Sequence, residues 1–147
     1  MIALGALDMS KGQLTGMQGV YLVAAELSKR GLVVSTTSRG ARGADLLATD
    51  PDCRKALSVQ VKTNARSFGF FLVGQHAAGI RSDSHIFVLV NLRPKEIEYF
   101  IIPSLKLSDL VRTTKAKTGS QWWFIKRDEI SDCRDDWSCF NILNIKK

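Results

Sequence analysis

Apolar residues recur at helical spacing between Thr15 and Arg30, which predicts a helix with one buried stripe. Thr15 is a suitable N-terminal cap, and Gly31 follows a basic pair, an order typical of a helix end. Residues 1–14 show no clear period, so we expect an irregular lead-in before this helix. The predicted stripe consists of Met17, Val20, Tyr21, Ala24 and Leu27.

Runs of apolar and β-branched residues predict strands in the next part of the chain. The run at 32–37 predicts a first strand. The runs at 43–49 and 57–63 flank Asp50-Pro51-Asp52, a turn signal, and together they predict a β-hairpin.

The following residues show strand patterns and then a helix pattern. Residues 85–92 are nearly all apolar, as expected of a strand buried on both faces, and 97–102 predict the next strand. Either Ser104 or Ser108 caps a second helix, which we expect to run towards Lys117. Its buried side would consist of Leu107, Leu110 and Val111.

The remaining segments have weaker patterns. Residues 68–73 predict a short strand, and 74–84 predict a loop or a weak helix. Residues 122–125 predict a short strand or an aromatic patch, and the charged segment 128–136 predicts a helical turn. The aromatic residues expected to pack back on the domain are Trp137 and Phe140. In order, these elements predict an α/β (α+β) fold, with a central mixed sheet flanked by helices.

Length and composition predict a single domain over 1–147, with a core at about 15–117 and an aromatic C-terminal extension at about 118–147. A hydrophobic fraction of 45% is enough for a real core and excludes wholesale disorder. The formal net charge of +7 favours a polyanionic partner, DNA or RNA, over an acidic small substrate. Many soluble proteins are mildly basic without such a partner, so charge alone does not identify one.

The cysteines and the apolar runs indicate a cytoplasmic protein that does not enter a membrane. Cys53, Cys133 and Cys139 form no CxxC pair and have no histidine at zinc-ligand spacing, so we expect reduced thiols. No apolar run approaches the roughly 18 residues that would span a bilayer. Residues 1–7 lack a basic leader and make a poor signal peptide.

One group of polar residues in the predicted hairpin is suited to chemistry. Strand side chains alternate between faces, so Gln60 and Lys62 share one face, and Asp45 opens the facing strand. A structural role is also open for each. Asp45 can accept from nearby backbone N–H groups, Gln60 can bond across strands, and Lys62 can be a solvated strand charge.

The order of elements and four short segments resemble the PD-(D/E)XK nuclease superfamily, over about Gly16 to Ser104. Within it, the chain looks most like small resolvase-like and uncharacterised bacterial proteins with a QxK form of the motif. The matching segments are Gly19–Leu27 on the helix, Gly43–Leu47 and Gln60–Thr63 on the hairpin, and Ile102–Ser104 at a strand end.

The resemblance implies a restriction-endonuclease-like core and a metal-dependent phosphodiesterase, endonuclease-like and acting on DNA. Asp45, Gln60 and Lys62 would be the catalytic set. Asp45, the Gln60 amide oxygen and the Val61 carbonyl would hold Mg²⁺ or Mn²⁺. Lys62 would position the attacking water and stabilise charge on the phosphate.

Two departures from the family pattern keep an alternative open. Val20 stands where the helix carries a glutamate, with Gln18 the nearest polar substitute, and Gln60 replaces an acid. Glu26 lies two turns further along the helix, which should be too far to compensate. The alternative is a catalytically impaired nuclease-fold module that binds nucleic acid or a protein partner.

Basic residues bracket the hairpin, and we expect Arg39, Arg42 and Arg66 either to contact a phosphate backbone or to be loop charges in water. A second basic group looks more like a solvated face than a groove. It consists of Lys115, Lys117, Lys126 and Arg127.

The histidines and tryptophans carry weaker hypotheses. His85 opens a strand and is expected to be structural, and His76, in a loop-like segment, is the better functional candidate. Trp122 and Trp123 face opposite ways on a strand, so at least one should be core. The other could stack on a base or form a subunit interface, which leaves a homodimer open.

Overall fold

The computed structural model describes residues 4–38, 41–66 and 69–143. The helices are α1 (Leu4–Lys29), α2 (Gln75–Gly79) and α3 (Ser104–Leu110), and the 3₁₀ segments are η1 (Asp128–Cys133) and η2 (Trp137–Leu143). The strands are β1 (Val33–Thr36), β2 (Leu46–Thr49), β3 (Ala56–Asn64), β4 (Phe70–Leu72), β5 (His85–Asn91), β6 (Glu98–Pro103), β7 (Arg112–Lys115) and β8 (Gln121–Lys126).

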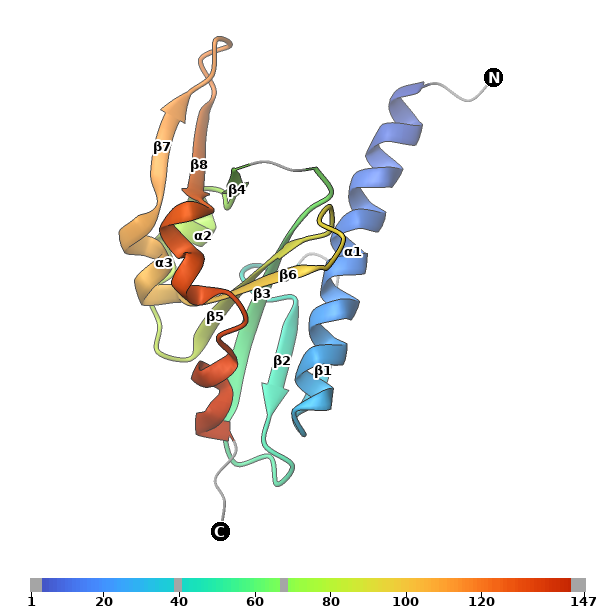
Figure 1. The fold of residues 1–147 in the computed structure, drawn as a ribbon, viewed down its shortest axis with the longest axis vertical. Coiled ribbons are helices and arrows are strands. Elements are labelled where there is room, and N and C mark those ends of the chain that lie inside the picture. Colours follow the sequence, from blue (N-terminus) through green and yellow to red (C-terminus); the bar gives the residue numbers. More distant parts are fainter. Residues whose placement is uncertain (1–3, 39–40, 67–68, 144–147) are drawn as a thin grey trace.

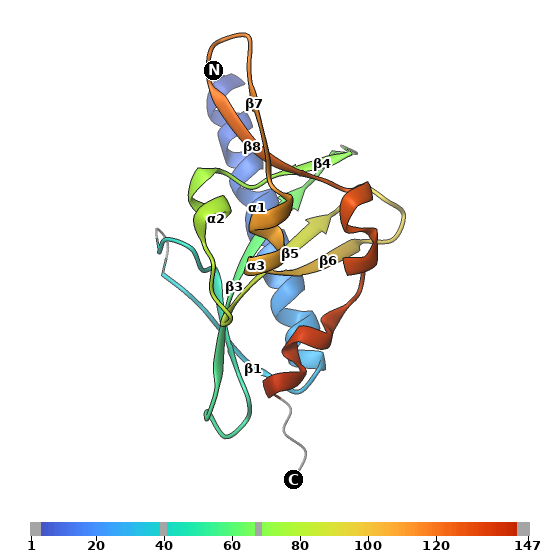
Figure 2. The same ribbon diagram turned by 90° about the vertical axis from the view of Figure 1, so that its left-hand side faces the viewer.

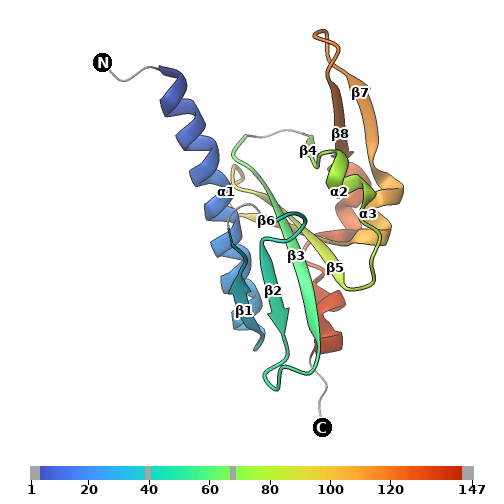
Figure 3. The same ribbon diagram turned by 180° about the vertical axis from the view of Figure 1, so that it is seen from behind.

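The central sheet is mixed, as the sequence predicts. Its strand order is β1-β2-β3-β5-β6, in which only β3 and β5 run parallel. A second sheet has the order β4-β8-β7. Figures 1 and 3 show α1 along one side of the central sheet, and the β7–β8 hairpin projecting from the body of the molecule. The predicted α/β class with helices flanking a mixed sheet is therefore confirmed.

Both faces of the central sheet are covered. On one face, Val23 and Leu27 of α1 pack with Val59 of β3 and with Val88 of β5, and η2 completes this core. The other face meets α2, α3, η1 and the second sheet, as Figure 2 shows, with α1 behind the sheet and α2 and α3 in front. Every residue of β5 is buried, which confirms the strand predicted to have two covered faces.

Helix α1 begins earlier than expected. Residues 4–14 are helical and do not form the irregular lead-in that the sequence predicts. No proline interrupts this stretch, and its glycines each cost only about 1 kcal/mol in a helix. The predicted end is confirmed, since Gly31 follows α1 with a positive φ of 83°. No helix in the described parts of the chain is long and apolar enough to cross a membrane.

The second helix is shorter than expected. It stops at Leu110 instead of running towards Lys117, because the β-branched Thr113 and Thr114 lie in β7, which pairs with β8. Ser104 begins α3, but its side chain does not cap the helix. Its hydroxyl donates to the Ser82 carbonyl at 2.7 Å and accepts from the Ser82 N–H at 2.9 Å.

Residues 64–84, whose pattern is weak, contain the short strand β4 and the short helix α2, and Phe68 of the predicted strand lies outside the described residues. In β8, Trp122 is exposed and Trp123 packs partly buried against the second core, as strand alternation predicts. Trp137 and Phe140 are buried against the α1 face, also as expected. The three cysteines are free thiols.

A buried carboxylate joins the far end of β5 to the C-terminal region. The Glu98 carboxylate accepts from Asn91 Nδ2 at 3.1 Å and from Arg127 Nε at 3.1 Å, and it lies 3.4 Å from Arg134 Nη1. The Arg127 guanidinium is the main reason that the pKa of this carboxyl lies below its usual range. We call these residues the Glu98 cluster. Arg127 is therefore partly exposed and held by a buried carboxylate, and it is not simply one charge of the solvated basic face that its sequence neighbours suggest.

Candidate active site

Asp45 lies directly before β2, and its carboxylate fills a gap in the hydrogen-bond ladder. The N–H of Val61 points toward β2, where its acceptor is Asp45 Oδ2 at 2.8 Å instead of a backbone carbonyl. The carbonyl of Ala44 is turned away to accept from Thr37 Oγ1 at 2.7 Å. The Asp45 N–H still donates to the Val59 carbonyl at 2.8 Å. One carboxylate oxygen therefore fixes the start of the strand, which is the structural role that the sequence left open.

Gln60 and Lys62 lie together on the face of β3 opposite α1. Their neighbours Val59 and Val61 are buried in the α1 core, whereas Gln60 and Lys62 are half-buried on the other side. The β2–β3 register ends at the pair Leu46–Val59, and beyond it Asp45 contacts both neighbours of Gln60: its N–H donates to the Val59 carbonyl and its carboxylate accepts from the Val61 N–H. The structure thus brings Asp45 and Gln60 next to each other, with Lys62 two residues further along the same face.

One polar atom of each of these two side chains lacks a partner within the described parts of the chain. The Oε1 atom of Gln60 is buried and has no hydrogen-bond partner among the described residues. Within the same residues, Lys62 forms no ion pair. A buried carbonyl oxygen without a donor costs about 1–3 kcal/mol, so its retention needs an explanation.

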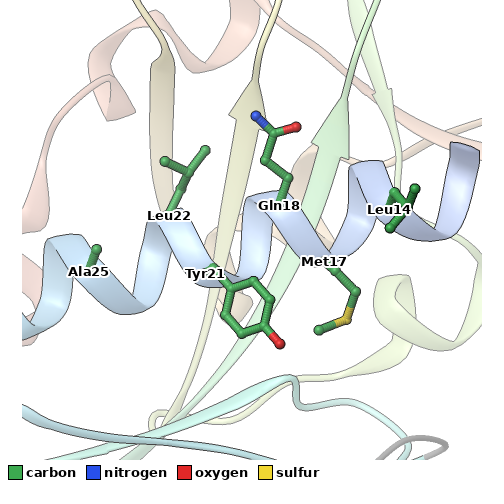
Figure 4. A pocket seen from close by; sticks show the side chains of 6 residues that line it. All are labelled: Leu14, Met17, Gln18, Tyr21, Leu22 and Ala25. Carbon is green, nitrogen blue, oxygen red and sulfur yellow. The ribbon is translucent and has the colours of Figure 1, made fainter.

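Of the α1 side chains that the structure describes, none brings a carboxylate to this face. Val20, at the position of the family glutamate, is buried in the core on the opposite side of the sheet. Gln18 is exposed and lines a pocket of apolar side chains along α1, shown in Figure 4. Glu26 is held by Arg30 at 2.7 Å and by Lys29 at 3.3 Å. The Arg30 contact is the main reason that the pKa of Glu26 is lowered.

His85, which the sequence suggested was only structural, lies beside this group. The register of the parallel strands pairs it with Ser58, which shares its face with Gln60. The ring is buried, with Nδ1 2.6 Å from Ser58 Oγ, and Nε2 has no partner among the described residues. Burial lowers the pKa of the imidazole, an effect that the nearby Asp45 charge opposes and His76 reinforces. A polar residue opening an apolar strand was the only sequence signal for this placement.

His76 lies on α2, next to the loop that leads into Asp45. Gly43 in that loop has a φ of +82°, and a Cβ there would lie 3.6 Å from His76 Nε2 and 3.3 Å from Ile80 Cδ1. Only glycine adopts this backbone readily, so the sequence allows α2 to rest against the loop. Together with Gln75 and Gly79, His76 and Ile80 line a shallow pocket.

The basic residues expected near the hairpin divide into two groups. Arg42 and Arg66 are exposed, and neither forms an ion pair with another described residue. Arg39 lies outside the described residues. The two exposed arginines are therefore free to contact an anionic partner.

The resemblance implies a divalent cation, and few side-chain atoms on this face of the sheet could act as its ligands. Among the described residues, no three His, Cys, Asp or Glu side chains are grouped to hold a metal. The available oxygens are the Asp45 carboxylate, one atom of which already binds Val61, and the orphaned Oε1 of Gln60. A buried acceptor without a donor suits a cation, and Asp45 and Gln60 together offer one charged and one neutral oxygen ligand.

Comparison with protein-family models finds no match, and comparison with curated proteins finds none. Among solved structures, the chain is similar to Hjc, a Holliday junction resolvase from the archaeal hyperthermophile Archaeoglobus fulgidus. The two are 14% identical with a TM-score of 0.46, over 74% of this chain and 88% of that one. The architecture described above rests on this chain's own register and packing.

Proposed function

We propose that this chain is a PD-(D/E)XK-like, metal-dependent phosphodiesterase that cleaves DNA. The observation that carries the proposal is the group formed by Asp45, the orphaned Oε1 of Gln60 and the unpaired ammonium of Lys62 at one face of the sheet. Carboxylate and amide oxygens beside a free lysine suit a phosphate ester and its cation.

Each residue has a distinct role in this proposal. Asp45 and Gln60 Oε1 hold Mg²⁺ or Mn²⁺, with the Val61 carbonyl as a further ligand. The bound cation supplies Lewis-acid stabilisation of phosphate charge and a more acidic water. Lys62 orients the attacking water and offsets the charge that develops on the phosphoryl oxygens. Arg42 and Arg66 seat the DNA backbone, together with Arg39.

The reaction is a hydrolysis at phosphorus. The water oxygen forms a bond to phosphorus, one P–O ester bond breaks, and the leaving oxygen takes a proton. The other water proton passes to solvent. The products are a phosphate monoester and an alcohol, and no oxidant or second substrate is needed.

The test is plasmid nicking with a matched pair of lysine variants. Wild type should nick supercoiled DNA with Mn²⁺, and Lys62→Ala should reduce the rate at least about 100-fold, as for loss of a charge-stabilising group. Lys95→Ala removes an exposed lysine in the β5–β6 turn and should keep the wild-type rate. Equal rates for all three proteins would point to contamination and overturn the proposal.

The burial of Val20 in the apolar core, at the helix position where the resemblance implies a glutamate, favours one rival, a nuclease-fold module that binds nucleic acid without cutting it. It predicts DNA binding that weakens steeply with salt, no nicking with Mg²⁺ or Mn²⁺, and no effect of Asp45→Asn on affinity. Titrating labelled duplex DNA and RNA over a salt series separates the two functions and compares the two nucleic acids.

A further inference from the structure

The sheet β4-β8-β7 has one face in the core and one face that nothing described covers. Cross-strand partners share a face, so the register divides its side chains into two sets. Phe71 and Ile125 belong to the set that is buried in the core opposite α1. No side chain of the other set is buried, and we call this set the outer face. It consists of Phe70, Leu72, Arg112, Thr114, Trp122, Phe124 and Lys126.

Aromatic side chains are accessible on the outer face. Trp122 is 46% exposed, and it lies on the β7–β8 hairpin that projects from the body of the molecule in Figure 1. Phe124 is two residues away on the same strand, so the two Cα atoms are roughly 7 Å apart. The Phe124 ring meets that of Phe70 edge-on, with centroids 5.8 Å apart. Exposed rings arranged along a strand are suited to stacking on nucleic-acid bases.

Every charged residue between positions 112 and 126 is basic. Arg112 is engaged by Glu129, 3.2 Å from its Nε. The three lysines are exposed, and none forms an ion pair with another described residue. Lys126 lies on the outer face near the base of the hairpin, and Lys117 lies in its turn. Free positive charge therefore lies at both ends of the aromatic surface.

This charge distribution decides between two occupants of the outer face. A second copy docked through the same patch would bring identical lysines together, because a two-fold interface uses one surface twice. No acidic residue of β7, β8 or their turn would offset that repulsion. A nucleic acid supplies phosphates for the lysines and bases for the rings. Only unpaired bases present their faces to an aromatic side chain, so the chemistry favours a single strand.

The outer face adjoins the proposed active site through β4. The Asn64 side-chain amide at the end of β3 donates to the Phe70 carbonyl at 3.0 Å. Lys62 is two residues before Asn64 on the same face of β3, roughly 7 Å along the strand. Arg66 is exposed in the connection between β3 and β4. A strand on the outer face can therefore continue along this connection to Lys62.

We propose that the outer face binds a single-stranded part of the DNA substrate. Bases stack on Trp122 and Phe124, and Lys117 and Lys126 contact the phosphates. Lys115 lies on the opposite face of the hairpin and takes no part in this binding. The inference rests on the proposed function for the choice of DNA, and it adds a preference for substrates with unpaired bases.

Fluorescence anisotropy with labelled oligothymidine, and with a duplex of equal length, tests the inference. Trp122→Ala should weaken single-strand binding about 5- to 100-fold and leave duplex binding unchanged. Trp122→Phe keeps a ring and should retain most of the affinity, which guards against an effect of misfolding. Tyr21→Ala removes an exposed ring from α1 and should change neither affinity. Thermal midpoints establish that all variants are folded.

A matched pair of lysine variants locates the phosphate path. Lys126→Ala should lower the slope of log single-strand affinity against log salt by about 0.7, the value for one phosphate contact on a single strand. Lys115→Ala removes an exposed lysine from the opposite face of the same hairpin and should leave the slope unchanged. Equal changes in the two variants would overturn the assignment of the phosphates to the outer face.

The remaining outcomes separate this inference from the proposed function. Wild type that binds oligothymidine no more tightly than Trp122→Ala overturns the inference, whether or not it nicks plasmid. A dimer that Trp122→Ala converts to a monomer in sedimentation, with no change in affinity, would make the outer face an interface between copies. Tighter binding of oligouridine than of oligothymidine through Trp122 overturns the choice of DNA. Binding that depends on Trp122, without metal-dependent nicking, overturns the proposed function alone.

Discussion

The two ends of β5 carry buried polar groups on the same face of the sheet, but the two ends differ in whether these groups have hydrogen-bond partners. His85 and Asn91 are six residues apart, roughly 20 Å along the strand. At the Asn91 end, both oxygens of Glu98 have partners, and Asn91 is bonded to Glu98. At the His85 end, His85 Nε2 and Gln60 Oε1 have none among the described residues.

The difference separates polar residues that hold the fold from those available for binding. The Glu98 cluster links β5 and β6 to the C-terminal 3₁₀ segments through ion pairs. The carboxylate oxygens of Glu98 therefore already have partners within the protein. At the His85 end, the side-chain atoms Gln60 Oε1 and His85 Nε2 are left without partners among the residues that the structure describes. Burial without partners costs stability, so this end is expected to serve a ligand.

The largest effect on stability is expected from Glu98→Gln. The substitution preserves size but removes the charge that two guanidinium groups share, and we expect a loss of about 2 kcal/mol in the free energy of unfolding. Both arginines are partly exposed, which keeps the loss from being larger. Urea unfolding measures it. Glu96→Gln, at an exposed site in the β5–β6 turn, is the control, and equal stabilities would contradict a structural role for the Glu98 cluster.

The same cluster should make stability fall in acid. The folded pKa of Glu98 lies below its ordinary value of 4.5, so its contribution is complete above that pH and is lost as pH falls through the folded pKa. The stability gap between wild type and Glu98→Gln should therefore narrow below pH 4.5. Carboxylates present in both proteins cancel in this difference. A gap that stays constant down to pH 2.5 would contradict the prediction, and urea unfolding over a pH series measures it.

At the other end of the comparison, removing a polar group should increase stability. Gln60→Leu deletes the orphaned oxygen and should raise the free energy of unfolding by about 1 kcal/mol in the presence of a chelator. Asn91→Leu makes the equivalent change where the polar group is bonded, and it should destabilise. The two urea midpoints should move in opposite directions, and movement in the same direction would remove the contrast between the two ends.

The smallest effects are expected for the exposed arginines. Arg42→Ala and Arg66→Ala should each lower the slope of log affinity against log salt by about 1 and weaken DNA binding uniformly across sequences. Arg93→Ala, at the exposed β5–β6 turn near Asn91, should leave the slope unchanged. Fluorescence anisotropy with labelled duplex DNA over a salt series measures all three. An equal change for Arg93 would indicate binding by net charge alone.

Local patterns sufficed for much of the fold and for part of the site. The period of two along β3 placed Gln60 and Lys62 on one face, because strand alternation depends only on neighbours in sequence. The end of α1 at Gly31 was likewise set by local backbone preference. The continuous apolar run of β5 indicated burial on both faces for the same reason.

The features that local sequence patterns did not predict depend on contacts between residues far apart in the sequence. Ser58 and His85 are 27 residues apart, and only the parallel register brings them into contact, so the sequence alone predicts no more than a structural role for the ring. Glu98 and Arg127 are 29 residues apart, and Arg127 was grouped with its charged neighbours instead. Residues 112–115 form β7 because β8 provides a partner strand, and this pairing prevails over the helix that the sequence pattern predicts.

The parallel pairing of β3 with β5 has a consequence for how the molecule could be adapted. Parallel neighbours cannot be joined by a tight turn, so the chain between them must arch over one side of the layer. Here that arch contains β4 and α2, and it passes over the side that bears Gln60 and His85. Lengthening or trimming the arch would reshape the approach for an incoming polymer while leaving the underlying strands untouched. For the proposed nuclease, selectivity for one nucleic-acid shape over another would then be tuned in this arch, independently of the residues proposed to act on the phosphate.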